Sequence, residues 1–249
     1  MTYALGTLGV RGVVLDIEGT TTPISFVYDV LFPYARTHLR EFLESHGATG
    51  LLAEVDRQLR EEHAADIARG DAPPPLPADV SSGNAADLEP YVLWLMDRDR
   101  KSPALKLLQG MIWQQGFADG TLRGELFPDV PAALERWRTS SIDVAIYSSG
   151  SVLAQRLIFG HTPAGDLTPR INQFFDATIG AKRSADSYRY IAAELRHDPA
   201  ELLFLSDVHA ELLAARAAGF QTMLCVRPGN PEPAREDEPV VQSFDEIVA

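Results

Sequence analysis

The sequence predicts an α/β protein: a Rossmann-like parallel sheet forms the core, and a helical cap domain is inserted after the first strand. Two observations favour this fold class. Short apolar runs alternate with helical patterns in the second half of the chain, and one further run stands alone near the amino terminus, followed by a long helical segment. With 249 residues, 45% of them hydrophobic, the chain can bury one large core, or a core and a smaller insert.

Five apolar, partly β-branched runs have the length of buried strands. They cover residues 13–15, 144–147, 177–179, 202–205 and 222–226. Helical patterns lie between the later runs, over 152–159 up to Gly160, over 188–195, and over 211–218 up to Gly219, a glycine suited to a left-handed helix cap. Because strand and helix alternate, the sheet should be parallel.

The segment between the first two strands is too long for a crossover connection and predicts an inserted domain. We expect a core of residues 1–22 and 125–249 and a helical cap of residues 23–124 over the active site. Apolar residues recur at helical spacing over 27–43 and 51–59, and two more helices are expected at 91–96 and 103–117. Ser102 is placed as N-cap of the last helix, with Pro103 as its first residue. Loops are expected at 72–77 and 81–84, whose sequences break helices.

Composition excludes several classes of function. Lys and Arg number 22 against 35 Asp and Glu, which gives a net charge of −13 and a field that repels nucleic acid and anionic membranes. No stretch approaches the ~18 apolar residues of a membrane span, and no export signal is recognisable. The single cysteine, Cys225, excludes a disulfide framework, and the six scattered histidines give no zinc site. A cytoplasmic protein without nucleic-acid or membrane partners is expected.

Two carboxylates follow the first strand, in the segment Asp-Ile-Glu-Gly-Thr-Thr-Thr at residues 16–22. Ligands of parallel sheets bind at the carboxyl ends of the strands, and Asp16 and Glu18 would point the same way if the extended conformation continued. A carboxylate attacks phosphorus when a cation screens its charge, and a second acid protonates the leaving oxygen. Asp16 is therefore the candidate nucleophile and Glu18 the candidate acid. Taken alone, the segment is also compatible with a turn cap and a solvated carboxylate.

Polar residues follow the other predicted strands as well. Ser148 and Ser149 precede a helix, where they bind phosphate or serve as an ordinary N-cap. Lys182 could neutralise a phosphate, and Asp207 could complete a magnesium site with Asp16. Glu211 is expected to orient Asp207. Because these features occur in order at the strand ends of one sheet, a shared active site is the better interpretation.

These residues resemble the four motifs of the haloacid-dehalogenase superfamily, matched by Asp16 to Thr20, Ser148, Lys182 and Asp207. A closer resemblance, to the acireductone synthases, the enolase-phosphatases of methionine salvage, extends over 16–24, 31–34, 105–110, 146–151 and 226–230, nearly the whole chain. It implies a magnesium-dependent phosphatase with enolase activity. Its substrate would be 2,3-diketo-5-methylthiopentyl-1-phosphate, and its products the acireductone 1,2-dihydroxy-3-keto-5-methylthiopentene and phosphate. Glu18 stands where most phosphatases of the superfamily have aspartate, which leaves its acid role open.

The expected mechanism passes through an aspartyl-phosphate on Asp16. One Mg²⁺ per subunit would be held by Asp16, Asp207 and the backbone carbonyl of Glu18, while Ser148, Ser149 and Lys182 bind the phosphate. The partner is a small phosphorylated diketone, and a monomer is expected. The base for enolisation stays open between Glu18 and a cap residue.

Rival functions are a sugar-phosphate phosphatase or phosphomutase of the same fold, a metal-independent dehalogenase, and a phosphate-binding protein without turnover. The sequence also leaves open whether Arg98, Lys101, Lys106 and Arg227 reach the phosphate or have other roles. Trp94 and Trp113 are expected in the helical core.

Overall fold

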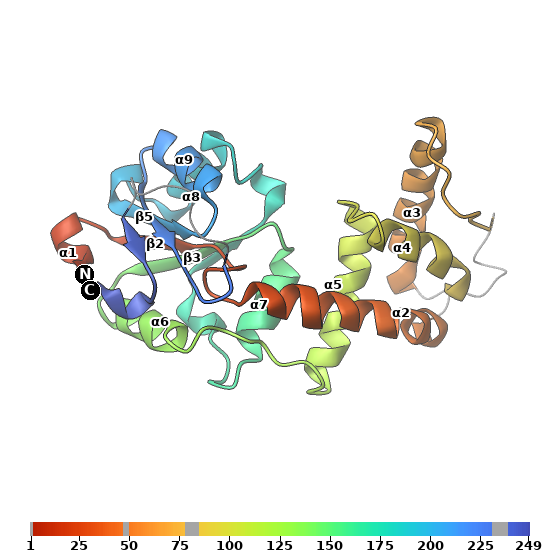
Figure 1. The fold of residues 1–249 in the computed structure, drawn as a ribbon, viewed down its shortest axis with the longest axis horizontal. Helices are drawn as coiled ribbons and strands as arrows, with labels where there is room; N and C mark the ends of the chain where they lie inside the picture. Colours follow the sequence, from red (N-terminus) through yellow and green to blue (C-terminus); the bar gives the residue numbers. More distant parts are fainter. Residues whose placement is uncertain (1, 47–49, 78–84, 231–238) are drawn as a thin grey trace. The chain divides into compact units, whose positions relative to one another are not determined.

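The computed structural model describes residues 2–46, 50–77, 85–230 and 239–249 (Figure 1). Contacts within the chain divide it into two compact units, Met1–Tyr28 with Arg123–Ala249, and Asp29–Leu122. The first unit holds the sheets and the second is helical, and each is described by itself.

The first unit contains a six-stranded sheet with the order β4-β3-β2-β5-β6-β7, parallel throughout as expected. Its strands are β2 Gly12–Leu15, β3 Asp143–Tyr147, β4 Gln173–Phe175, β5 Leu202–Ser206, β6 Gln221–Cys225 and β7 Val240–Val241. A second, two-stranded sheet pairs β1 Tyr3–Ala4 with β8 Ile247–Val248. Helix α1, Leu5–Leu8, follows β1 and ends at Gly9, whose φ is +70°.

Strand β2 lies at the point where the direction of strand addition reverses. The chain adds β3 and β4 on one side of β2, then β5 and β6 on the other, so Leu15 pairs with both Ile146 and Leu205. All four residues of β2 are buried because both faces of the sheet are covered. Such a reversal opens a crevice at the carboxyl ends of the two central strands, which is where ligands bind in this class of sheet.

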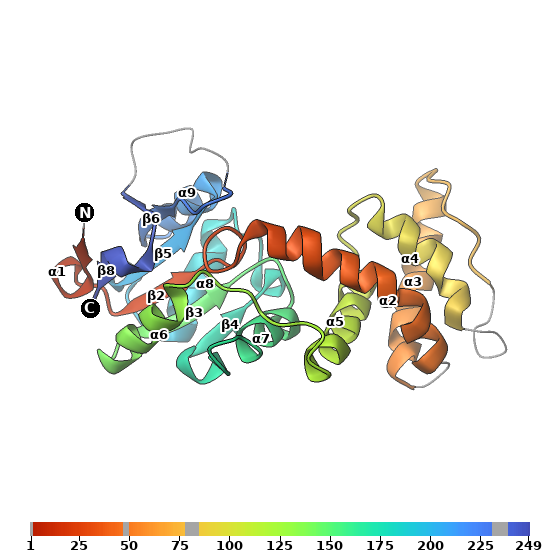
Figure 2. The same ribbon diagram turned by 60° about the horizontal axis from the view of Figure 1, so that its bottom comes forward.

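Helices cover the sheet on both sides (Figures 1 and 2). Helices α8, Ala185–Leu195, and α9, His209–Ala217, pack on the face that carries Val14, Ala145 and Phe204. Helices α6, Val130–Thr139, and α7, Val152–Gly160, lie on the other side and contact β3 and β4, respectively. The turn after α9 contains Gly219 at φ +98°, which confirms the left-handed glycine expected there.

The predicted strand at 177–179 is wrong. Ala177–Ile179 is a short 3₁₀ helix, and the strand is the preceding β4, Gln173–Phe175. Asp176 ends the extended segment because its carboxylate accepts the Thr178 N–H at 2.9 Å. Gly180 follows at φ +135° and leads the chain toward Lys182, so the lysine still follows the third strand of the sheet in chain order.

The second unit is built from the helices expected in the insert. The π-helical turn η1, Phe26–Leu31, leads into α2 Phe32–His46, followed by α3 Gly50–Ala68, the 3₁₀ turn η2 Ala85–Leu88, α4 Glu89–Met96 and α5 Pro103–Ala118. The Ser102 cap is confirmed, since its hydroxyl accepts the Leu105 N–H at 2.9 Å. Residues 72–77 are not helical, and 81–84 lie outside the described residues.

Trp94 and Trp113 are buried in this unit, as expected. Across the ranges that the structure describes, no helix combines the length and apolarity needed to cross a bilayer.

Candidate active site

Asp16 stands directly after β2, at the switch point of the sheet. Its N–H donates to the Leu205 carbonyl at 3.0 Å, which continues the strand pairing by one residue. The residue is only 4% exposed. Oδ1 accepts the Ile17 N–H at 2.7 Å, and Oδ2 lies 3.0 Å from the Ser206 hydroxyl at the end of β5. The nucleophile candidate is thus a buried carboxylate with a fixed orientation.

Lys182 reaches this carboxylate from the loop after β4. Its Nζ lies 2.6 Å from Asp16 Oδ1 and 2.6 Å from Glu211 Oε2. The Tyr188 hydroxyl donates to the Lys182 carbonyl at 2.7 Å and fixes the loop backbone. Burial alone would lower the pKa of Lys182, but the charges of Asp16 and Glu211 outweigh it and raise that pKa. The side chain is therefore a buried ammonium ion beside the candidate nucleophile.

Asp207 follows β5 and completes a cluster of acidic side chains. Burial, and then the charge of Asp16, raise the pKa of Asp207 from 3.8 to about 7. Its Oδ1 is buried without a hydrogen-bond partner. A buried carboxylate without a donor, beside other carboxylates, is the environment that a divalent cation with oxygen ligands stabilises. Among the described residues, no three Asp, Glu, His or Cys side chains are arranged so that they could hold a metal ion. A cation at Asp207 therefore also needs a backbone oxygen as a ligand.

Glu211 does not orient Asp207 as the sequence suggested. Its carboxylate contacts Lys182 at 2.6 Å and the Ser206 hydroxyl at 3.0 Å. Toward Asp207 it acts as a like charge that contributes to the raised pKa. Burial and the charge of Asp16 raise the pKa of Glu211 as well. Glu211 is therefore the counter-ion of Lys182.

Glu18 lies in a tight turn, because the extended conformation ends at Asp16. The N–H groups of Thr20, Thr21 and Thr22 all donate to the Ile17 carbonyl, at 2.9–3.1 Å. The alternation argument that placed Glu18 beside Asp16 therefore does not apply. The chain turns sharply at Gly19, whose φ is +70°.

The two serines after β3 differ in burial. Ser148 is 3% exposed, and its hydroxyl accepts the Gly150 N–H at 3.1 Å. Ser149 is exposed. The cap of α7 is Ser151, whose hydroxyl accepts the Ala154 N–H at 3.3 Å, so neither serine is needed to cap that helix.

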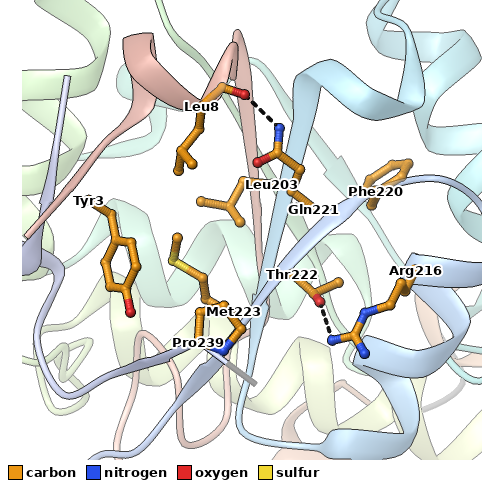
Figure 3. A pocket seen from close by; sticks show the side chains of 9 residues that line it. All are labelled: Tyr3, Leu8, Leu203, Arg216, Phe220, Gln221, Thr222, Met223 and Pro239. Atoms are coloured by element: carbon orange, nitrogen blue, oxygen red, sulfur yellow. Dashed lines mark hydrogen bonds between the residues drawn. The ribbon is translucent and has the colours of Figure 1, made fainter. Parts of the chain in front are cut away.

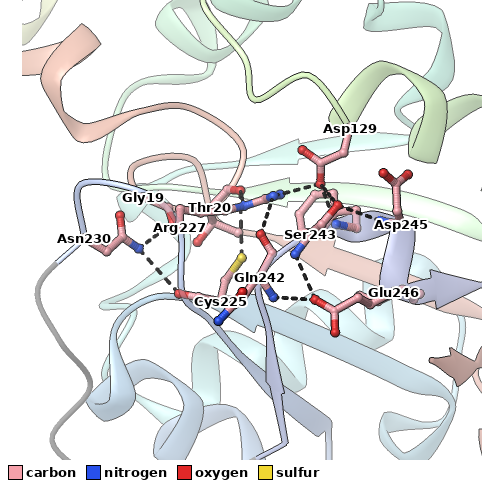
Figure 4. Close-up of polar contacts among 12 residues, drawn as sticks. Gly19, Thr20, Asp129, Cys225, Arg227, Asn230, Gln242, Ser243, Asp245 and Glu246 are labelled. Carbon is pink, nitrogen blue, oxygen red and sulfur yellow. Dashed lines mark hydrogen bonds and ion pairs between the residues drawn. The ribbon is translucent and has the colours of Figure 1, made fainter. Parts of the chain in front are cut away.

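Arg227 has a structural position that the sequence did not reveal. It is buried after β6, where Nε donates to the Thr20 carbonyl at 3.0 Å and Nη1 lies 2.8 Å from the Asp129 carboxylate (Figure 4). The rings of Phe127 and Phe244 lie 4.7 Å and 4.4 Å from the guanidinium carbon. Arg227 therefore supports the loop after β2.

Arg98 and Cys225, also noted in the sequence, make packing contacts outside the acidic cluster. In the helical unit, Arg98 stacks over the Trp94 ring at 4.2 Å. Burial raises the pKa of the Cys225 thiol to about 12, which makes it an unreactive core residue.

A hollow of about 430 Å³ in the first unit lies apart from these residues. Nine side chains line it, and none is a predicted site residue (Figure 3): Tyr3, Leu8, Leu203, Arg216, Phe220, Gln221, Thr222, Met223 and Pro239. The candidate chemistry is therefore concentrated at the strand ends.

A parallel sheet with a buried aspartate at its switch point, a lysine on that aspartate and a further aspartate after the neighbouring strand defines a haloacid dehalogenase-like hydrolase. The family model of these hydrolases matches residues 10–219. Enolase-phosphatase E1 of Synechococcus elongatus is 48% identical over 96% of the chain and 98% of its own length. That of Drosophila melanogaster is 44% identical over 88% of the chain and 84% of its own.

Among solved structures, the UTR4 protein of Saccharomyces cerevisiae has a TM-score of 0.76 and 32% identity, covering 95% of the chain and 99% of its own. The chain belongs to the enolase-phosphatases, a family of haloacid dehalogenase-like hydrolases. The resemblance found in the sequence is confirmed. It favours a phosphatase over the dehalogenase, and an enolase-phosphatase over the sugar-phosphate enzymes. Enzymes of this family generally use Mg²⁺.

Proposed function

We propose that this chain converts 2,3-diketo-5-methylthiopentyl-1-phosphate into the acireductone 1,2-dihydroxy-3-keto-5-methylthiopentene and phosphate, with Asp16 as nucleophile. Family membership supports the overall reaction, the enolase-phosphatase step of methionine salvage. The observation that supports the nucleophile is the buried Asp16 carboxylate at the switch point, with the Lys182 ammonium 2.6 Å away.

The phosphatase step is a double displacement. An oxygen of Asp16 forms a bond to phosphorus while the bond between phosphorus and the substrate oxygen breaks, and the departing enol oxygen takes a proton from Glu18. Water then attacks the phosphorus of the aspartyl-phosphate, which releases phosphate and restores the carboxylate. The Ile17 N–H and Lys182 hold the Asp16 side chain in one orientation for the attack.

The residues present fit a divalent cation. Asp16, Asp207 and the backbone carbonyl of Glu18 would hold Mg²⁺, one per subunit. The unpartnered Asp207 Oδ1 supports this assignment because a buried carboxylate oxygen needs a cation or a donor. When bound, the ion reduces the repulsion between the Asp16 carboxylate and the phosphate.

The phosphate would be bound by Lys182, Ser148 and Ser149. Ser148 accepts the Gly150 N–H, so its own proton can be donated to a phosphate oxygen. Lys182 supplies a charge that stabilises the negative equatorial oxygens. For the enolisation, Lys182 would polarise the carbonyl, and Glu18 is the base that we propose to test.

The deciding experiment follows the enol by absorbance and phosphate release in parallel, with and without Mg²⁺. The wild-type protein should produce both signals only with Mg²⁺. Asp16→Asn should abolish phosphate release, and turnover retained in that variant would eliminate the covalent route. Continued enolisation by Glu18→Gln would exclude Glu18 as base. A panel of sugar phosphates is the control, and preference for any of them would contradict the assigned substrate.

We further propose that the enzyme acts as a monomer in the cytoplasm. The buried, unreactive Cys225 and the acidic charge of −13 are compatible with that compartment. Light scattering coupled to size exclusion measures the mass in solution, and a dimer would contradict the first part of this proposal.

A further inference from the structure

We propose that Asn230 is a positioning residue of the cation site and sets its affinity for Mg²⁺. The inference rests on the proposed function, because it takes Asp207 and the Glu18 carbonyl as ligands. Asn230 follows β6, far along the chain from both. The mechanism above gives it no role.

The Asn230 amide group holds the backbone at Gly19 (Figure 4). Nδ2 donates to the Gly19 carbonyl at 2.8 Å and lies 3.4 Å from the Cys225 carbonyl. These two acceptors fix the orientation of the amide, since the flipped amide would place its oxygen against two carbonyl oxygens. Asn230 therefore holds the peptide group that follows Gly19.

The peptide group before Gly19 is held too. The Gly19 N–H donates to the Thr22 carbonyl at 2.8 Å. That N–H belongs to the same planar unit as the Glu18 carbonyl, so the direction of the carbonyl is fixed with it. Because Asn230 holds the peptide group after Gly19, the two peptide groups that flank Gly19 are both restrained. The backbone carbonyl oxygen of Glu18 therefore has one defined position.

Asn230 also lies beside Asp207. A β-carbon placed on Gly19 would be 3.0 Å from Asn230 Oδ1 and 2.4 Å from Asp207 Oδ2, so both side chains pack against the bare glycine. Asn230 Oδ1 and Asp207 Oδ1 are both buried without a hydrogen-bond partner. Two buried acceptors without donors are stabilised by a cation or by water that the cation holds. Asn230 thus bonds to the residue after Glu18 and packs beside Asp207, so it lies next to both proposed ligands.

The same segment supports the next carbonyl of the loop. Arg227, three residues earlier, donates from Nε to the Thr20 carbonyl at 3.0 Å. The consecutive carbonyls of Gly19 and Thr20 are therefore both held from the loop after β6. A segment that restrains the loop at two successive peptides fixes its geometry more firmly than a single contact does.

The test measures Mg²⁺ binding without substrate. Isothermal titration of the metal-free full chain should give an Mg²⁺ Kd raised about 10-fold or more in Asn230→Ala, the usual cost of losing a residue that orients metal ligands. Activity of that variant should recover at saturating Mg²⁺, which a generally damaged protein would not show. If Asn230→Ala does not fold, Asn230→Leu, which keeps a similar side-chain volume but has no donor, takes its place and should raise the Mg²⁺ Kd by the same factor.

Asn172→Ala is the matched control. This asparagine also bridges backbone and side chain, accepting the Val144 N–H and donating to Asp143 at 2.8 Å, but at the amino ends of β3 and β4. It should leave the Mg²⁺ Kd unchanged. An Mg²⁺ Kd within about twofold of wild type in folded Asn230→Ala, or an equal rise in Asn172→Ala, overturns the inference. Absence of Mg²⁺ binding by the wild type would instead overturn the cation site of the proposed function.

Discussion

The ammonium group of Lys182 lies between two carboxylates, 2.6 Å from Asp16 and 2.6 Å from Glu211. The single ammonium of Lys182 is thus paired with two buried carboxylates, and Asp207 is a third carboxylate in the same cluster. The cluster has an excess of negative charge although its substrate is an anion. A second cation is the simplest way to balance it, and the effect of each charge can be measured.

Replacement of Lys182 by Met should lower both activity and stability. Two buried carboxylates lose their cation, which costs about 3–5 kcal/mol in other proteins, and loss of the phosphate-binding charge should reduce kcat about 10²–10³-fold. Because Lys182 lowers the already raised pKa of Glu211, its removal raises that pKa further. A raised carboxyl pKa destabilises the fold above the ordinary pKa, and the penalty disappears as pH falls.

Thermal unfolding between pH 5 and pH 8 tests this prediction. The Tm difference between Lys182→Met and wild type should be largest at pH 8 and shrink toward pH 5. Lys101→Met, at an exposed lysine of the helical unit, is the control and should shift Tm little at any pH. A Tm difference that does not depend on pH would contradict the explanation.

Asp207→Asn should stabilise the metal-free protein and remove its response to Mg²⁺. The pKa of Asp207 is raised from 3.8 to about 7, so its ionisation destabilises the fold by an amount on the order of 4 kcal/mol at high pH. Without Mg²⁺, the variant should unfold at a higher temperature than wild type at pH 8, and the gap should narrow toward pH 5 as Asp207 becomes protonated in the folded state. With Mg²⁺, only wild type should gain stability. A wild type that is the more stable protein at pH 8 without Mg²⁺ would refute this prediction.

Gly19→Ala should disable the site beyond the cost of backbone strain. The added β-carbon would approach Asp207 Oδ2 to 2.4 Å, so the carboxylate must move. Gly9→Ala is a matched control because Gly9 has the same φ of +70° but open space around it. Gly9→Ala should lose about 1 kcal/mol in urea unfolding from backbone strain and Gly19→Ala more, because its β-carbon also displaces Asp207. Only Gly19→Ala should lose Mg²⁺ affinity and most of its phosphatase activity. Equal activities in the two variants would show that the contact with Asp207 is unimportant.

Arg227→Met should destabilise the first unit by up to about 3–5 kcal/mol, because it leaves the Asp129 carboxylate, whose side chain is only 9% exposed, without its cation. Asp129 also accepts the Ser243 hydroxyl at 3.1 Å, so the loss extends to the chain before β8. Urea unfolding of Arg227→Met, Asp129→Asn and the double variant gives the coupling between the two residues. The double variant should be more stable than the sum of the single losses predicts, and simple additivity would argue against the ion pair.

The sequence was sufficient for β2, β3, β5 and β6 because these strands are short apolar runs, whereas β7, Val240–Val241, was not predicted. Asp16, Lys182 and Asp207 were predicted to lie close together. In the structure Lys182 forms an ion pair with Asp16, and the charge of Asp16 contributes to the raised pKa of Asp207. Parallel strands align their carboxyl ends, so chain order alone predicts such meetings. The error at 177–179 has the same origin, because an apolar triplet does not distinguish a strand from a 3₁₀ turn capped by Asp176.

What the sequence could not predict depends on contacts between distant segments. Arg227 was ambiguous because its partners, Thr20 and Asp129, come from other parts of the chain. Ser206 was overlooked although it stands beside Asp207 at the strand end, a position that could have marked it. Glu211 was assigned to Asp207 because the two are close in sequence, whereas its hydrogen bonds go to Lys182 and Ser206.

The loop that carries the nucleophile is synthesised early, but its supports come from the last part of the chain. Arg227 lies 207 positions after the Thr20 carbonyl it holds, and Asn230 lies 211 positions after Gly19. Contacts between residues so far apart in sequence form slowly. During synthesis a chain also folds from its amino terminus, before these later residues are available. A nascent chain should therefore pair β2 with β3 and β5 before the loop after β2 is held in place, so an unfinished chain lacks an ordered active site.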